Sequence, residues 1–517
     1  MVPRPDRRDD AVSAAPQIVI ASPLDSVATA ILPISAGSIV AVPGGGLHAV
    51  EPIAAGHKIA LRAHAPGEIV IKLGQGIGVA RDAIGVGAHV HSHNLAFVPD
   101  LSRTAPPAPL AAPSRRTAMF DGYVRDDGRV GTRNFVGVLT SVNCAATVAR
   151  RIADHFTPER LMAWPGVDGV VAFGHMSGCG MAKTGAGMDN LRRTIGGYAR
   201  HPNFAGIVLV GLGCEVNQID DLVTHEALET GGRLATLGIQ DAGGTRAAIA
   251  AGIAAVEALL DRASIARRTS VSAANLTLGL QCGASDGYSA LTANPALGRA
   301  VDLLVAAGGR AILSETPEIF GAQSLLLDRA VDTRVAAALC DKVAWWRDHA
   351  NASGMTLDAN PSPGNIAGGI TTILEKSLGA VAKSGSSPLA DVVDYAAPVT
   401  VPGLTFMDTP GYDPCSATGQ IAGGATLIAF TTGRGSVFGS KPAPTLKLAS
   451  NSALAQRMAE DIDIDCGQLL SGAATLDQLG EEIFAALLAT ASGKPTASER
   501  NGIGDDEFVP WVPGVWM

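Results

Sequence analysis

The sequence predicts a multidomain α/β protein in which a small β-rich module is followed by two α/β regions with parallel or mixed sheets. Short apolar segments separated by glycine and proline turns fill residues 15–99, and a proline- and alanine-rich stretch covers 100–119. Beyond it, apolar runs alternate with amphipathic stretches of helical length. The 517 residues allow two to four domains, since single cores stop growing near about 250–300 residues.

The β-rich module is predicted from four apolar segments, "QIVIA", "SIVAV", "HKIALRA" and "EIVIKLG". Glycine and proline between them are typical of tight turns joining short strands. The polar residues 1–14 before the module are expected to form a disordered tail. Residues 100–119, which have no usable periodicity, are expected to be a linker.

The two α/β regions are predicted over 120–268 and 269–517. In the first, "NFVGVLT", "GVVAFG" and "GIVLVG" are each followed by a helical pattern. The alternation restarts at "NLTLGL" and "RAILSE", and further helices are expected near 322–350 and 474–490. Strands that alternate with helices at this spacing favour a parallel or mixed sheet covered by helices.

Composition limits the ligands and the location. A net charge of −9 and a pI near 5.7 argue against a nucleic-acid or membrane surface, because phosphate binding needs clustered Lys and Arg. No apolar run approaches the roughly 20 residues that span a bilayer, and the first residues lack an apolar signal core. We therefore expect a cytoplasmic protein that binds a small molecule and forms a homo-oligomer, a dimer or larger.

Four of the seven cysteines directly follow a predicted strand or its trailing loop: Cys144, Cys179, Cys214 and Cys282. In parallel sheets, ligands bind outside the carboxyl ends of the strands, so these thiols are expected to meet in one pocket. A single free cysteine is more often an inert, buried small hydrophobe, and Cys340 in a helical pattern keeps that interpretation. An odd number of thiols in a long chain also favours reduced thiols or metal ligands over a disulfide framework.

The segment "GAHVHSHNL" carries His89, His91 and His93 at alternate positions. On a strand all three would project to one face and could bind a metal or a carboxylate. The alternative is a solvated edge of the small module.

Polar residues also gather in glycine-rich stretches after residue 360. These are Asn365, Asp408, Thr432, Arg434 and Lys441. Backbone amides of glycine-rich turns together with Arg and Lys suit a carboxylate or a phosphate, although a long ordered surface loop would give the same pattern. No phosphate-binding glycine motif follows a strand, so nucleotide binding has no support.

Several long motifs resemble the altronate and galactarate dehydratase family. They include "GHMSGCGM", "GLGCEVNQ", "LQCGASDGYSALTANPALG", "ILSETPEIFGA", "NPSPGN" and "FMDTPGYDPCSATGQ". The first module is similar to the SAF domain that these enzymes carry at their N-terminus. The resemblance covers nearly the whole chain and implies a metal-dependent hydro-lyase that removes water from an altronate-like or galactarate-like sugar acid to give a 2-keto-3-deoxy acid.

The resemblance also implies a metal, usually Fe²⁺, with Mn²⁺ as an alternative; the four thiols themselves leave an iron–sulfur cluster open. Metal ligands are expected from Cys144, Cys179, Cys214 and Cys282, since thiolates suit both a single iron and a cluster. Expected catalytic groups are His175, Glu215, Asp286, His91 and His93. Expected substrate contacts are Ser285, Asn294, Asn365, Thr432, Arg434 and Lys441.

The chain departs from the family pattern where "GNK" is expected, because Ile366 stands at the lysine position. Isoleucine can neither take a proton nor bind a carboxylate. Two alternatives follow: a lyase of the same scaffold acting on another 2-hydroxy acid, such as sulfolactate with release of sulfite, or a sugar-acid binding protein without catalysis.

Overall fold

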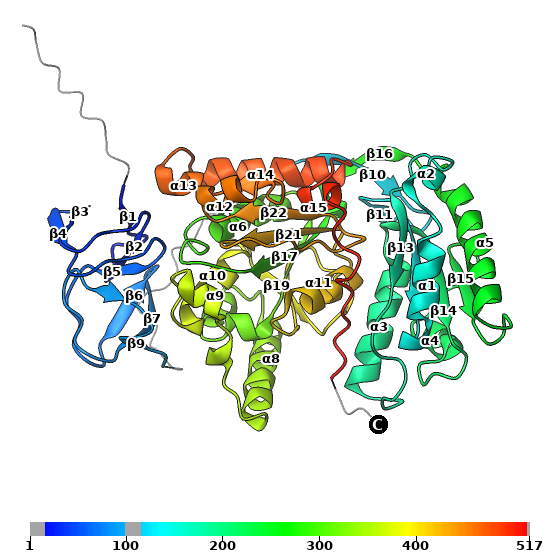
Figure 1. Cartoon of the computed structure of the whole chain (residues 1–517), viewed down its shortest axis with the longest axis horizontal. Helices are drawn as coiled ribbons and strands as arrows, with labels where there is room; N and C mark the ends of the chain where they lie inside the picture. The colour runs from blue at the N-terminus through cyan, green and yellow to red at the C-terminus, as the bar shows by residue number, and fades with distance from the viewer. Residues whose placement is uncertain (1–15, 99–114, 514–517) are drawn as a thin grey trace, which may run out of the picture.

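The computed structural model describes residues 16–98 and 115–513. Figure 1 shows three bodies in a row, with the C-terminal region between the N-terminal module and the second region. The expected tail at 1–14 and most of the expected linker at 100–119 lie outside the described residues. The order of the bodies in space therefore differs from their order in the sequence.

The N-terminal module consists of short antiparallel strands in three sheets, ordered β1-β2-β5-β8, β3-β4 and β6-β7-β9. Gly37, Gly56, Gly67 and Gly87 all have positive φ, and each stands two residues before a strand. A left-handed turn conformation is easy only for glycine, so the repeated glycines set the points at which the chain reverses. The strands are Ile18–Val19, Val27–Ala30, Ile39–Val42, Gly45–His48, Lys58–Ala60, Ile69–Lys72, Gln75–Ala80, His89–Val90 and Leu95–Ala96.

The second region is built on a parallel sheet of order β13-β12-β14-β15. Helices α1 and α5 pack on one face, and α3 and α4 lie on the other. The strands are Phe135–Thr140 (β12), Gly169–Phe173 (β13), Phe204–Gly211 (β14) and Leu234–Gly238 (β15). The helices are Ala146–Ala153 (α1), Pro158–Leu161 (α2), Ala186–Arg200 (α3), Ile219–His225 (α4) and Thr245–Ala263 (α5).

A small antiparallel sheet of order β11-β10-β16 adjoins the second region. Its strands are Met119–Val124 (β10), Val130–Gly131 (β11) and Arg268–Ser272 (β16). Strand β16 therefore brings the chain back beside β10 before the C-terminal region begins.

The C-terminal region holds a seven-stranded parallel sheet of order β19-β20-β18-β17-β21-β22-β23. Its strands are Thr277–Gly283 (β17), Arg310–Leu313 (β18), Leu389–Val393 (β19), Gly403–Met407 (β20), Leu427–Thr432 (β21), Thr445–Ala449 (β22) and Ile464–Asp465 (β23). The order reverses between β17 and β21, which makes their carboxyl ends the topological switch point, where ligands commonly bind. The predicted α/β class with parallel sheets is confirmed.

Helices α6 and α14 pack together on one face of this sheet, while α11 on the other face packs against α3 of the second region. One apolar core therefore continues from the second region into the C-terminal region. The helices are Ala293–Ala306 (α6), Ser324–Leu327 (α7), Thr333–Ala352 (α8), Pro363–Ala367 (α9), Ile373–Ala382 (α10), Asp413–Ala422 (α11), Ser452–Arg457 (α12), Gln468–Ser471 (α13), Leu476–Ala491 (α14) and Ala497–Arg500 (α15). Among residues 16–98 and 115–513, no helix combines the length and the apolar composition needed to cross a bilayer.

A buried ion triad fastens the module to the C-terminal region. Glu375 of α10 accepts hydrogen bonds from Lys58 at 2.9 Å and from Lys72 at 2.7 Å, and all three side chains are nearly inaccessible. Burial alone would raise the pKa of the Glu375 carboxyl, but the two ammonium groups outweigh burial and hold this pKa well below its ordinary value. Burial lowers the pKa of Lys58 to about 8.

We expect Glu375→Gln to weaken this attachment, because it leaves two lysines buried without a counter-charge. Removing one member of a buried ion pair commonly costs about 3–5 kcal/mol of stability. The midpoint of urea unfolding should fall accordingly. Glu68→Gln, which removes an exposed ion pair with Arg62 in the same module, serves as the control and should change the midpoint little. Equal midpoints for the two variants would contradict the role of the buried ion triad in attaching the module.

Candidate active site

A thiol and two carboxyl groups meet at the carboxyl edge of the seven-stranded sheet. Cys282 is the second-to-last residue of β17, and Glu315 and Glu318 follow β18. Their ligand atoms lie within 4.8 Å of one another, and Cys282 Sγ is 3.8 Å from Glu318 Oε2. All three residues are at most 5 % exposed. These residues form the acid–thiol cluster.

The backbone at Glu315 is held in an unusual conformation. Its φ is 70°, in the left-handed region, and its amide donates to Thr409 Oγ1 at 2.9 Å. A non-glycine residue in this region is strained, and such strain often marks a functional site. The Glu315 carboxylate oxygens are buried and find no hydrogen-bond partner among the described residues. An unpaired buried carboxylate is costly by itself, so this group is suited to a cation or a proton.

Lys376 of α10 and Lys383, the residue that caps the C-terminus of this helix, supply positive charge to the cluster. Lys383 Nζ lies 3.0 Å from Cys282 Sγ, and Lys376 Nζ donates to Glu318 Oε1 and to Asn360 Oδ1, each at 2.7 Å. Seven residues make about two helical turns, so the lysines share one face of α10. Their ammonium groups balance part of the negative charge of the cluster.

Burial sets the protonation of the acidic groups. It raises the pKa of the Cys282 thiol to about 11 although Lys383 opposes this. Burial and the neighbouring Glu318 raise the pKa of Glu315 well above its ordinary value. For Lys383, burial alone would lower the pKa, but Cys282 and Glu315 outweigh it and raise this pKa.

Asp413 completes the site as the first residue of α11. A side chain at Gly283 would place its Cβ 2.4 Å from Asp413 Oδ2, so the glycine leaves room for the carboxyl group beside the end of β17. Burial and Glu318 raise the pKa of Asp413 to about 7. This carboxyl group can therefore hold or release a proton at neutral pH.

The arrangement combines three functions that an elimination needs. The thiol and carboxylates could hold a divalent cation, and the unpaired oxygens of Glu315 fit that role. The lysines can bind a substrate carboxylate. Asp413 can transfer a proton near neutral pH.

The polar residues after β17 hold the turn together. Asp286 accepts hydrogen bonds from the amides of Tyr288 and Ser289 and from the side chains of Ser450 and Asn451. Each of its oxygens is therefore engaged, which fits a structural role better than the expected catalytic one. Gly433 also packs against it, since a Cβ there would lie 2.4 Å from Asp286 Oδ1.

The expected substrate contacts in this region are likewise engaged within the protein. Asn294 donates to Gly379 O and accepts from Thr431. Asn365 donates to Ser285 O at 2.9 Å and accepts from Ser362 at the start of α9. Together these bonds tie the turn after β17 to the segments on either side of the cluster.

The histidines of the module gather around a turn and not along a strand, because β8 ends at Val90. His57 joins them, with its Nδ1 2.9 Å from His89 Nε2 and its ring centroid 4.6 Å from that of His91. His93 lies near His89, with ring centroids 5.4 Å apart and the two rings tilted. Burial lowers the pKa of His89 to about 3 and that of His91 to about 4, so both rings are neutral at pH 7.

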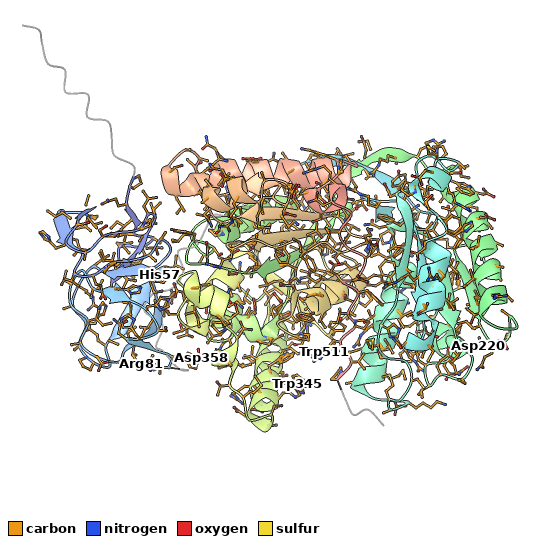
Figure 2. All side chains as sticks on the ribbon, viewed as in Figure 1. His57, Arg81, Asp220, Trp345, Asp358 and Trp511 are labelled. Atoms are coloured by element: carbon orange, nitrogen blue, oxygen red, sulfur yellow. The ribbon has the colours of Figure 1, made fainter. Side chains whose placement is uncertain are left out.

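This histidine group contacts the C-terminal end of α9, the helix that precedes α10. His91 Nε2 donates to Ile366 O at 3.0 Å, and His57 Nε2 to Ala367 O at 3.2 Å. Figure 2 shows His57 on the side of the module that faces the C-terminal region. Ile366, at the position where the family pattern has lysine, is therefore next to the imidazoles, with its side chain partly buried.

The four strand-end cysteines do not share one pocket. Cys282 belongs to the seven-stranded sheet, whereas Cys144, Cys179 and Cys214 follow strands of the second region and are exposed. His175 and Glu215 stay with the latter three, both buried, His175 bonded to Thr140 O and Glu215 to Ser141. The expectation of one site failed because strand-end loops converge only within a sheet, and the chain forms two parallel sheets.

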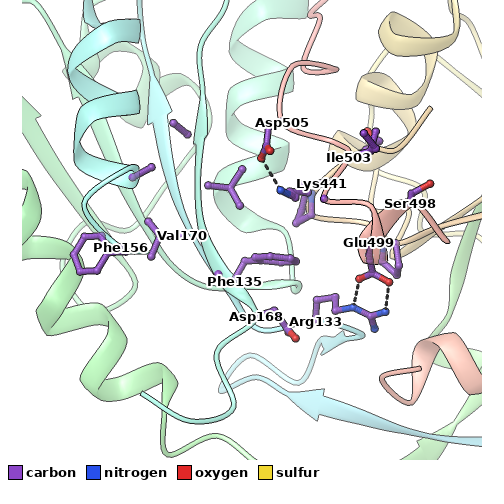
Figure 3. A pocket seen from close by; sticks show the side chains of 18 of the residues that line it. Arg133, Phe135, Phe156, Asp168, Val170, Lys441, Ser498, Glu499, Ile503 and Asp505 are labelled. Carbon is purple, nitrogen blue, oxygen red and sulfur yellow. Dashed lines mark hydrogen bonds and ion pairs between the residues drawn. The ribbon is translucent and has the colours of Figure 1, made fainter. Parts of the chain in front are cut away.

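The remaining expected contacts lie elsewhere. Thr432 Oγ1 accepts from the Gly435 amide, and Arg434 is exposed. Lys441 pairs with Asp505 at 2.6 Å and lines a cavity of about 820 Å³ between the second and C-terminal regions (Figure 3). Asp408 accepts from Thr316 and Trp346. None of these residues contacts the acid–thiol cluster through a described hydrogen bond.

Sequence reasoning missed five members of the site: Glu315, Glu318, Lys376, Lys383 and Asp413. The signals were present in "SETPEI", which places two acids after a strand, and in "LEKSLGAVAKS", whose lysines are seven residues apart. Neither pattern shows that the two segments meet.

We expect Asp413→Asn to stabilise the protein increasingly as pH rises. An acid with a raised folded pKa favours the folded state only while protonated, so stability is lost between its unfolded pKa of about 3.9 and its folded pKa of about 7. The variant removes this loss and should melt at a higher temperature than the wild type at pH 8, with a smaller difference at pH 5. Asp477→Asn, an exposed change, is the control. A difference in melting temperature between the variant and the wild type that is the same at pH 5 and pH 8 would contradict the raised pKa of Asp413.

Family models match three consecutive parts of the chain. Residues 16–97 match an altronate/galactarate dehydratase SAF domain, 122–264 the second domain of D-galactarate dehydratase/altronate hydrolase, and 273–516 the C-terminal part of D-galactarate/altronate dehydratase.

Curated relatives match over most of the chain. An altronate dehydratase of Escherichia coli (strain K12) is 37% identical over 92% of this chain and 96% of its own length. An altronate dehydratase of Bacillus subtilis (strain 168) is 32% identical over 92% and 95%. A galactarate dehydratase (L-threo-forming) of Escherichia coli (strain K12) is 35% identical over 89% and 90%. The resemblance seen in the motifs is thereby confirmed, and the chain belongs to the altronate/galactarate dehydratase family.

Proposed function

We propose that the chain is a hydro-lyase that removes water from a sugar acid, an altronate-like aldonate or a galactarate-like aldarate, to give a 2-keto-3-deoxy acid. The observation that carries the proposal is Asp413, a carboxyl group with a pKa of about 7 beside a buried thiol, two carboxyl groups and two ammonium groups. The names of the curated relatives, altronate and galactarate dehydratases, support the substrate class.

The reaction breaks a C–H bond next to the carboxylate and a C–O bond at the next carbon. We assign Lys376 and Lys383 to the substrate carboxylate, because their charges would stabilise the negative charge that grows there as the proton leaves. We assign one oxygen of the Glu315 carboxylate, which has no partner among the described residues, as the base that takes this proton. We assign Asp413 as the acid that protonates the departing hydroxyl group, so that water is the leaving group. The resulting enol becomes the 2-keto acid by tautomerisation.

We further propose that Cys282, Glu315 and Glu318 hold a divalent metal, Fe²⁺ or Mn²⁺. The support is the buried Glu315 carboxylate without a partner among the described residues and the closeness of the three ligand atoms. When bound, such a cation supplies positive charge to the substrate carboxylate and α-hydroxyl group.

The first test measures the metal and the product together. The purified protein, loaded anaerobically with Fe²⁺, should form 2-keto acid from at least one member of a panel of aldonates and aldarates. Glu318→Gln should weaken metal binding by more than about 100-fold, since even groups outside the ligand shell contribute about 10- to 100-fold. Glu481→Gln, an exposed acid, is the control.

The panel includes sulfolactate, with sulfite measured alongside, because Ile366 replaces the expected lysine. If the protein releases sulfite and forms no 2-keto-3-deoxy acid, its reaction is the alternative lyase reaction and not dehydration. Metal-bound protein that forms no product from any acid would contradict an enzymatic function.

The second test is the pH dependence of the reaction. If Asp413 donates the proton, kcat/KM should fall on the alkaline side with an apparent pKa of no more than about 7, because the ionised carboxylate has no proton to give. Asp413→Asn should lower kcat by about 10²- to 10⁴-fold and remove this limb. An unchanged alkaline limb in the variant would assign the proton transfer to another group.

A further inference from the structure

Three exposed thiols line the carboxyl edge of the second region's sheet. Cys144 follows β12, Cys179 follows β13 and Cys214 follows β14. These strands are adjacent in the order β13-β12-β14, and Asp220, labelled in Figure 2, marks the helix that begins just after the Cys214 loop. Free cysteine is among the most buried residue types, so three exposed ones on neighbouring loops are unusual for packing residues.

Hydrogen bonds next to the cysteines join the three loops. The Asn143 amide donates to Ser177 O at 2.9 Å, and the Asn217 amide donates to Gly178 O at 3.0 Å. Gly178 has a φ of 98°, and a Cβ there would lie 2.3 Å from Ser141 O. The loop after β13 can therefore lie against the loop after β12 only because this residue is glycine.

Buried polar groups beneath the thiols fix the loops further. Asn217 Nδ2 donates to Ser141 O at 3.1 Å and its Oδ1 accepts from Arg192 at 3.1 Å. Glu215 accepts from Ser141 Oγ at 2.7 Å and from the Gly213 amide at 2.6 Å. Glu215 therefore holds the Cys214 loop in place. The loops that carry the thiols are fixed by buried hydrogen bonds before any ligand binds.

The spacing of the thiols is wider than one ion requires. Three thiolates around a tetrahedral ion, with bonds of about 2.3 Å, would be roughly 3.8 Å apart. Within the parts of the chain that the structure describes, the acid–thiol cluster is the one group of three ligand atoms lying within 4.8 Å of one another. At least one pair of the three exposed thiols is thus more than 4.8 Å apart, and an iron–sulfur cluster, which spreads its cysteine ligands over several irons, tolerates that spacing.

We propose that Cys144, Cys179 and Cys214 ligate an iron–sulfur cluster in the second region, a metal centre separate from the acid–thiol cluster. Three thiolates are one fewer than the four that such clusters commonly have. With three thiolates from this chain, such a cluster would leave one ligand position for a group other than cysteine. The proposal does not depend on the function assigned to the C-terminal region.

The full-length protein is tested by anaerobic reconstitution with Fe²⁺ and sulfide. The wild type should gain a broad visible absorption and bind iron and acid-labile sulfide in comparable amounts. Cys144→Ser, Cys179→Ser and Cys214→Ser should each lose most of the absorption and the sulfide. Cys340→Ser, an exposed thiol on α8, and Cys282→Ser in the acid–thiol cluster should keep both. Circular dichroism shows whether each variant is folded.

The proposal is overturned if the reconstituted wild type binds no sulfide, or if it binds a single iron without sulfide. It is also overturned if the triple serine variant, folded as the wild type is, keeps the absorption. Loss of the absorption in Cys282→Ser, with retention in the other three, would move the cluster to the C-terminal region. None of these measurements uses enzymatic activity. A failure of the cluster proposal can therefore be told apart from a failure of the dehydratase proposal.

Discussion

The site depends on the contact that two lysines, one within α10 and one at its C-terminal end, make with a buried thiol and buried carboxyl groups. Without Lys376 and Lys383, the residues Cys282, Glu315 and Glu318 would bring several acidic groups into a region shielded from water, where unpaired charge is very costly. The two ammonium groups leave the negative charge only partly balanced. Burial, together with the negative charge of Glu318 that remains, raises the pKa of Asp413 to about 7 and keeps a transferable proton in the site.

The same helix connects the site to the N-terminal module. Glu375 points to Lys58 and Lys72 of the module, and the next residue, Lys376, points to Glu318. Neighbouring residues on a helix face different directions, so one turn of α10 serves both contacts. The module thus packs against the turn of α10 that carries Lys376. Its histidines contact α9, the helix that precedes α10.

Sequence patterns predicted the sheets better than the site. The alternation of strands and helices and the position of Cys282 at a strand end follow from local periodicity, and the structure has them. The meeting of "SETPEI" with "LEKSLGAVAKS" depends on how α10 packs over the ends of β17 and β18, and Asp413 enters from a third segment. Likewise, His57 joins the other histidines through the pairing of β5 with β8, which local spacing does not show.

The sequence by itself determined the α/β class, the β-rich module and the placement of thiols after strands, because each depends on residues close together in the chain. Tertiary structure alone decided that the cysteines are divided between two sheets and that the C-terminal region lies in the middle. It also decided which polar groups are left unpaired. Burial and neighbouring charges set the protonation of Glu315 and Asp413, and both arise only when distant segments pack together.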